Sequence, residues 1–168
     1  MQRMLIGVLG PGEGAGQADI DDAQLVGELV AKAGWAVLTG GRAAGVMGAA
    51  AKGAHAAGGL TVGILPTPDA LTASPAVDVV LATGLGEARN AVIAQSANAC
   101  VVCGMNPGTA SEVALAIRAK KPVVLVRADE VTARFFRSLD GDVVRVAMSA
   151  GEAIEMLRGV LVSGARPV

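Results

Sequence analysis

The sequence predicts an α/β fold in which a mostly parallel sheet of about seven strands lies between two layers of helices. The chain has 168 residues, of which 52% are hydrophobic and 17% are charged, so it can bury a sizeable core. Short runs rich in Val, Ile and Leu alternate with longer stretches of helical character. Because these runs are largely apolar throughout, we expect strands that are covered on both faces, as in parallel sheets. We therefore expect residues 1–168 to form one domain.

The apolar runs and the stretches between them give the order of the elements. The predicted strands are residues 4–9, 35–39, 61–65, 77–82, 99–103, 123–126 and 143–146. The predicted helices are residues 20–33, 46–57, 87–97, 110–119, 130–138 and 152–161. In the first helix the pairs Leu25/Leu29 and Val26/Val30 give an apolar stripe at spacing i,i+4, and Asp19 suits the N-terminal turn. The segment 66–76 contains three prolines and is predicted to be a loop.

Composition narrows the class of protein. The net charge of −1 does not provide the basic face typical of nucleic-acid binders, and only three aromatic residues are present to stack on bases. The uncharged stretch 91–111 contains Gln, Ser, Asn and Pro, so it is not predicted to cross a bilayer. The apolar N-terminal run lacks the cleavage site of a signal peptide. We therefore expect a cytoplasmic protein that binds neither nucleic acid nor membrane.

Glycine-rich turns follow three of the predicted strands. They are GPGEGAG at residues 10–16, TGGRAAGVMG at 39–48 and GMNPGT at 104–109. Ligands of such folds bind beyond the carboxyl ends of the strands, where glycine lets the backbone approach a phosphate and a helix N-terminus favours an anion. The glycines of any single turn can be explained by the positive φ that a tight turn requires. Three together favour an anion-binding site.

Other phosphate and metal motifs are absent or incomplete in the sequence. No G-x-x-x-x-G-K-[ST] motif occurs, and no acidic residue ends the second strand to bind a ribose hydroxyl. Cys100 and Cys103 have C-x-x-C spacing, but residues three apart in a strand point to opposite faces, so we interpret both as buried structural cysteines. His55 stands alone on a predicted helix. We therefore expect no metal site.

Three charged residues lie near the N-terminal ends of predicted helices. Thr109 and Glu112 have the spacing of a capping box, which favours a structural role, although the same carboxylate can stabilise a cationic sugar or orient water. Arg89 lies in the first turn of its helix, where a cation is disfavoured, so it is either surface charge or the partner of an anion. Arg42, inside the second glycine-rich turn, is likewise either surface charge or the partner of an anion.

Three further stretches carry a resemblance to a known family. The segments GGRAAGVMGAA (40–50), GGLTVGILP (58–66) and TGLGEARN (83–90) resemble the LOG-like superfamily, often labelled lysine decarboxylase-like, and its branch of molybdenum-cofactor carrier-like proteins. The resemblance covers nearly the whole chain and implies a Rossmann-like fold. The second signature of the family, P-G-G-x-G-T-x-x-E, is matched here by Gly108, Thr109 and Glu112. Met105 and Asn106 replace its paired glycines, and a Met side chain there can crowd a phosphate.

The resemblance implies a function and a set of site residues. It implies binding of a phosphate-bearing small molecule, either a nucleotide or a molybdenum cofactor, by a homo-dimer or homo-tetramer. It implies as the alternative an N-glycosidase (phosphoribohydrolase) that acts on nucleoside 5′-monophosphates. A non-catalytic structural or interaction protein is the third hypothesis. The implied catalytic residues are Arg89 and Glu112. The implied ligand-binding residues are Gly40, Gly41, Arg42, Gly45, Met47, Gly48, Asn90, Gly108 and Thr109.

Overall fold

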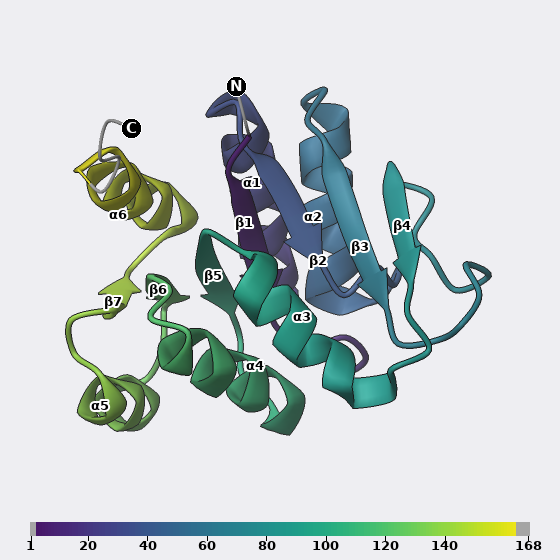
Figure 1. Cartoon of the computed structure of the whole chain (residues 1–168). Helices are drawn as coiled ribbons and strands as arrows, with labels where there is room; N and C mark the ends of the chain where they lie inside the picture. Colours follow the sequence, from purple (N-terminus) through teal and green to yellow (C-terminus); the bar gives the residue numbers. More distant parts are fainter. Residues whose placement is uncertain (1–2, 164–168) are drawn as a thin grey trace.

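The predicted fold class is confirmed by the computed structural model, which describes residues 3–163 (Figure 1). Seven strands form one sheet in the order β4-β3-β2-β1-β5-β6-β7. Every neighbouring pair is parallel, where a mostly parallel sheet was expected. The strands are β1 Leu5–Leu9, β2 Ala36–Thr39, β3 Thr61–Leu65, β4 Val79–Ala82, β5 Ala99–Cys103, β6 Val123–Val126 and β7 Val144–Ala147.

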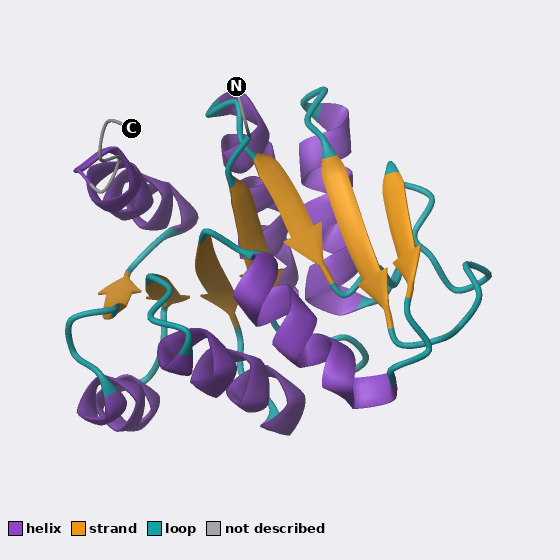
Figure 2. Cartoon of the chain, in the orientation of Figure 1, coloured by secondary structure: helices purple, strands orange, loops and turns teal. Residues whose placement is uncertain are grey.

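Helices cover both faces of this sheet, which gives the predicted three layers (Figure 2). The helices are α1 Gln17–Lys32, α2 Gly45–Ala56, α3 Arg89–Ser96, α4 Pro107–Arg118, α5 Glu130–Leu139 and α6 Ala150–Ser163, with a 3-10 turn, η1, at Gly86–Ala88. One buried cluster joins α1, α2 and α6 to the sheet, and a second joins α3, α4 and α5 to its other face. No described helix is long and apolar enough to cross a membrane.

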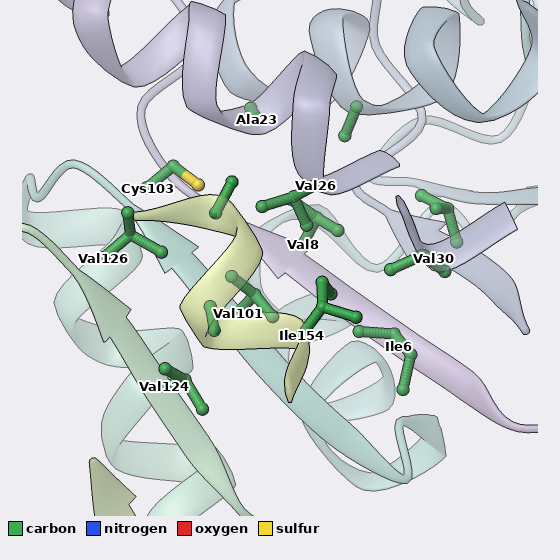
Figure 3. Packing of buried hydrophobic residues seen from close by; sticks show 14 of the residues in the cluster. Ile6, Val8, Ala23, Val26, Val30, Val101, Cys103, Val124, Val126 and Ile154 are labelled. Atoms are coloured by element: carbon green, nitrogen blue, oxygen red, sulfur yellow. The ribbon is translucent and has the colours of Figure 1, made fainter. Parts of the chain in front are cut away.

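Small aliphatic side chains fill the core between α1, α6 and the sheet (Figure 3). Ile6 and Val8 of β1 pack there with Val101 of β5 and Ile154 of α6, all of them almost fully buried. Successive residues of the central strands β1 and β5 are buried on both faces from Ile6 to Leu9 and from Ala99 to Cys103, as the sequence pattern predicted.

The edge strand β4 departs from that pattern. Its burial was predicted from an apolar run, yet Val79 is 43% and Leu81 47% exposed, so the expectation that every strand is covered on both faces is wrong here. The strand also begins two residues later than predicted. Asp78 lies just before it and accepts hydrogen bonds from the backbone N–H and hydroxyl of Thr61.

The helices α1, α4 and α6 begin two or three residues before their predicted starts. Gly16 is the N-cap of α1 and Asn106 that of α4, and in α4 Pro107 occupies the first helical position. Proline is favoured there because its missing N–H would have no helical partner. The apolar periodicity used for the prediction starts only after these capping residues.

The two cysteines lie on opposite faces of β5, as predicted. Cys103 packs in the cluster with α1, and Cys100 in the cluster with α3 and α4. Burial raises the pKa of both thiols to about 12, so neither carries thiolate at neutral pH. His55, near the end of α2, is exposed and lies 3.8 Å from Asp78.

Glycines let α1 and α2 approach each other closely. A Cβ built on Gly27 would lie 2.1 Å from the carbonyl oxygen of Ala50, and one on Gly53 would lie 1.9 Å from that of Gln24. Both glycines are buried within helices, so an added methyl group would have to push the backbones apart. The contact between α1 and α2 therefore depends on the absence of these side chains.

We expect Gly53→Ala to lower the free energy of unfolding by about 1–3 kcal/mol, because overpacking outweighs the gain in helix propensity. Gly151→Ala in α6 is the matched control, since its Cβ would meet only the hydroxyl of Ser149, at 3.9 Å. Urea denaturation of both variants checks this. Equal stability of Gly53→Ala and the parent would show that the two helices can separate at little cost.

Candidate functional site

A cavity of about 190 Å³ opens at the carboxyl ends of the central strands. The chain builds the sheet outward from β1 in one direction through β2, β3 and β4, and in the other through β5, β6 and β7. Such a reversal of strand order is where ligands bind in open α/β sheets. The lining residues come from β1, from the turns after β1, β2, β3 and β5, from η1 and from the first or second turns of α2, α3 and α4: Val8, Leu9, Gly10, Gly12, Arg42, Met47, Pro66, Glu87, Arg89, Asn90, Asn106, Gly108, Thr109 and Glu112.

The structure brings seven of the eleven predicted site residues to this cavity. They are Arg42, Met47, Arg89, Asn90, Gly108, Thr109 and Glu112. The other four, Gly40, Gly41, Gly45 and Gly48, are not among the lining residues. Sequence reasoning did not name Pro66, Glu87 or Asn106 as site residues, although Glu87 stands in the same TGLGEARN motif as Arg89.

Three glycines of the second turn serve its packing. Gly41 and Gly45 have positive φ, and a Cβ on Gly45 would lie 2.1 Å from the carbonyl oxygen of Gly12. A Cβ on Gly48 would lie 2.4 Å from the carbonyl oxygen of Ala43. The second turn also rests on the first, since the N–H of Val46 donates to the carbonyl of Pro11. The first two glycine-rich turns thus form one wall of the cavity.

The N-cap of α4 is Asn106, so the predicted capping box of Thr109 and Glu112 is wrong. The Asn106 Oδ1 accepts from the backbone N–H of Thr109 at 2.8 Å and from its hydroxyl at 2.9 Å. Asn106 is extended, with φ −149° and ψ 177°, as the steric demand of Pro107 dictates. The N-cap therefore lies three residues before the predicted one, and Glu112 lies in the second turn of the helix with no capping role.

Met105 turns away from this cavity. Its side chain packs against the cluster beneath α3 and α4 and lines a separate cavity beside Leu125 and Asp129. The expected crowding of a phosphate by this Met is therefore not found. Of the two residues that replace the paired glycines, only Asn106 lines the candidate site.

Arg89 is held in the wall of the cavity with part of its hydrogen-bonding capacity unused. Its Nη1 donates to the carbonyl oxygen of Ile64 at 2.9 Å, and its Nε is buried without a partner. Burial lowers the pKa of Arg89, while the charge of Glu112 opposes this effect and that of Arg42 adds to it. A buried donor without an acceptor is costly. Because Arg89 lines the cavity, its guanidinium places a fixed positive charge beside any anion that enters.

Glu112 lines the same cavity from α4. Burial raises the pKa of its carboxyl to about 7, against the opposing effect of the Arg89 charge. Among the described residues no ion pair within 4.0 Å joins these two side chains. The guanidinium and the carboxyl therefore present separate polar groups to one space, and near neutral pH the carboxyl exists in both protonation states.

Asn90 and Arg42 complete the polar lining from opposite sides. Asn90, next to Arg89 on α3, is buried and its amide donates to the hydroxyl of Ser111 on α4 at 3.4 Å. Arg42 is exposed and forms an isolated antiparallel bridge with Ala73 of the loop between β3 and β4. Two cationic side chains thus face the cavity, one fixed and one exposed.

A doubly wound parallel sheet with a polar cavity at its switch point defines a Rossmann-like ligand-binding protein. The comparisons with known proteins specify the class. The chain belongs to the SLOG cluster4 family, whose family model matches residues 3–154. This confirms the resemblance to LOG-like proteins that the sequence motifs indicated.

Solved structures of molybdenum cofactor proteins are similar over almost the whole chain. The molybdenum cofactor binding protein of Rippkaea orientalis is 43% identical, with a TM-score of 0.93 over 96% of this chain and 99% of that one. The molybdenum cofactor carrier protein of Chlamydomonas reinhardtii is 47% identical, with a TM-score of 0.91 and the same coverage. An uncharacterized protein of Archaeoglobus fulgidus is 41% identical over 127 residues, which are 76% of this chain and 82% of that protein.

Proposed function

We propose that this protein binds a phosphate-bearing small molecule and that the ligand is a molybdenum cofactor, which it carries as cargo. The observation that carries the proposal is the guanidinium of Arg89, whose Nε is buried in the wall of the cavity without an acceptor. The similarity to molybdenum cofactor binding and carrier proteins supports this choice of ligand.

The residues of the cavity fit the phosphate end of such a ligand. The cavity of about 190 Å³ is smaller than the roughly 300–1,000 Å³ of sites that enclose a whole small molecule. Arg89 and Arg42 supply positive charge, and the N-terminus of α4 adds the positive end of its dipole beside Gly108 and Thr109. We infer that the cavity holds the phosphate and that the remainder of the ligand extends out of it.

Glu112 supports a second candidate function, the N-glycosidase that uses water to hydrolyse a nucleoside 5′-monophosphate, the hydroxyl going to the ribose 5-phosphate and the proton to the released base. In this reaction the bond between the base and the sugar breaks with positive charge developing on the sugar. A carboxylate in a partly buried site stabilises such a charge, while Arg89 holds the phosphate of the same substrate. Both side chains line one cavity, as this reaction requires.

Two measurements distinguish these functions. Mass spectrometry of small molecules released from the purified protein is expected to find a pterin that carries phosphate. Incubation with a panel of nucleoside 5′-monophosphates is expected to release no ribose 5-phosphate. Release of ribose 5-phosphate would favour the glycosidase. A protein that co-purifies with no ligand and binds none of the phosphate compounds in calorimetry would contradict both.

We also propose that the protein acts in the cytoplasm as a homo-dimer or homo-tetramer. The exposed apolar side chains of β4 support an assembly, because a monomer leaves them in contact with water. Light scattering coupled to size-exclusion chromatography measures the mass of the assembly directly. A mass equal to the 16.6 kDa of one chain would contradict it.

A further inference from the structure

Gly40, the first residue after β2, is buried but does not line the cavity. It is not among the residues with positive φ, unlike its neighbour Gly41 at φ +78°. The backbone conformation at Gly40 therefore does not require glycine. The requirement comes from space, since a Cβ there would lie 2.0 Å from the Nη1 of Arg89 and 2.8 Å from its Cζ.

The guanidinium of Arg89 rests on two neighbouring strands. Thr39, the last residue of β2, is the register partner of Gly63 of β3, so Gly40 just after β2 follows Thr39 as Ile64 follows Gly63. The carbonyl oxygen of Ile64 accepts from the same Nη1 that lies against Gly40. This contact holds one edge of the guanidinium, and the Nε is buried without a partner in a side chain that lines the cavity.

We infer that Gly40 is a positioning residue for Arg89: its missing side chain makes the space in which the guanidinium is held against Ile64 and turned toward the ligand. This inference rests on the proposed binding function and assigns Gly40 a role other than contact with the ligand. A methyl group at position 40 would displace the guanidinium from Ile64 and so move the anion-binding group. The far end of Met47, 2.6 Å from that methyl group, can shift because its side chain is flexible.

A double-mutant cycle tests this inference with inorganic phosphate as the probe. The four proteins are the parent, Gly40→Ala, Arg89→Ala and the double variant, and NMR titration measures their affinity for phosphate. We expect Gly40→Ala to weaken binding at least tenfold. We expect the double variant to bind no more weakly than Arg89→Ala alone. Additive losses in the double variant would overturn the inference.

Thermal melting of the same four proteins gives a readout that needs no ligand. We expect Gly40→Ala to lower the melting temperature in the parent and much less in the Arg89→Ala background, where the clashing group is gone. Gly41→Ala is the matched control, because its positive φ makes alanine unfavourable in both backgrounds. An equal loss for Gly40→Ala in both backgrounds would overturn the inference. If Gly40→Ala alone does not fold, a double variant that also does not fold would overturn it, and a folded double variant is expected.

These two readouts separate failure of the inference from failure of the proposed function. The parent can fail to bind phosphate while Gly40→Ala still lowers the melting temperature less in the Arg89→Ala background than in the parent. In that case Gly40 does position Arg89, and the proposed binding function is wrong. The NMR signal of the Arg89 Nε–H adds a direct check. We expect it to shift when Gly40 becomes alanine and to shift on addition of phosphate to the parent.

Discussion

Arg89→Ala is expected to weaken binding of a phosphate-bearing ligand by about 1.5–3 kcal/mol, which is roughly 10- to 150-fold in the dissociation constant. The reason is the loss of charge-assisted hydrogen bonds from a guanidinium that is already held in place by the carbonyl of Ile64. Because the variant also removes a buried donor without a partner, we expect the protein to stay folded. Isothermal titration calorimetry with a nucleoside 5′-monophosphate and with the molybdenum cofactor measures the effect.

Arg42→Ala is the matched control for this experiment. Arg42 lines the same cavity but is exposed, so solvent screens its charge and its loss is expected to cost less than about 1 kcal/mol. Equal losses for the two arginines would indicate a general effect of charge and not a fixed anion contact. Unchanged affinity in Arg89→Ala would remove the main support for the proposed function.

Glu112→Gln is expected to abolish most of the pH dependence of anion binding between pH 6 and pH 8. The carboxyl has a pKa of about 7, so it is mainly neutral at pH 6 and mainly charged at pH 8. A charged Glu112 repels a phosphate and attracts Arg89, so the parent binds more weakly as the pH rises, by up to about tenfold per pH unit. Calorimetry at pH 6, 7 and 8 measures this slope in both proteins.

The ligand contributes a slope of its own, because the second ionisation of a phosphate ester has a pKa near 6. That contribution is common to the parent, to Glu112→Gln and to the control Glu87→Gln, which removes a carboxyl from the exposed rim of the same cavity. The prediction fails if Glu112→Gln and the parent show the same slope. Should the parent release ribose 5-phosphate, the same variant is expected to lower that rate by about 10²–10³-fold.

The stability of Glu112→Gln follows from the same pKa. The folded protein holds the proton up to a pH of about 7, whereas a solvated glutamate loses it near 4.5. The contribution of protonated Glu112 to stability is therefore complete below about pH 4.5 and is lost as the pH rises through 7. We expect Glu112→Gln to melt at a higher temperature than the parent at pH 8 and with a smaller difference at pH 5.

The sequence predicted all seven strands and six helices because apolar runs and apolar stripes report burial directly. It placed the start of α4 wrongly because Thr109 and Glu112 match a capping pattern, while the pair of Asn106 and Pro107 just before them is the actual helix start. The prediction used the capping pattern of Thr109 and Glu112 and missed the stronger N-cap signal of Asn106, three residues before Thr109.

The roles of the glycines could not be separated in the sequence. Gly40 and Gly41 are adjacent and look equivalent, yet one is needed for a positive φ and the other makes room for a side chain 49 positions away (89 − 40). The burial that sets the pKa of Glu112 likewise depends on elements that are distant along the chain. Short-range patterns thus predicted seven of the residues that line the cavity, and the fold determines how each of them is held there.

The pairing of β1 with β5 has a consequence for the order of folding during synthesis. The strands β1 to β4 are consecutive in the sheet, but the other edge of β1 is paired by β5, and the hydrogen bond from Leu5 to Asn98 joins residues 93 positions apart. While the ribosome makes the intervening chain, this apolar edge has no strand beside it and is exposed to pairing with other chains. The cavity also needs α4 from the later part, so a nascent chain gains affinity for the ligand only once that edge is closed.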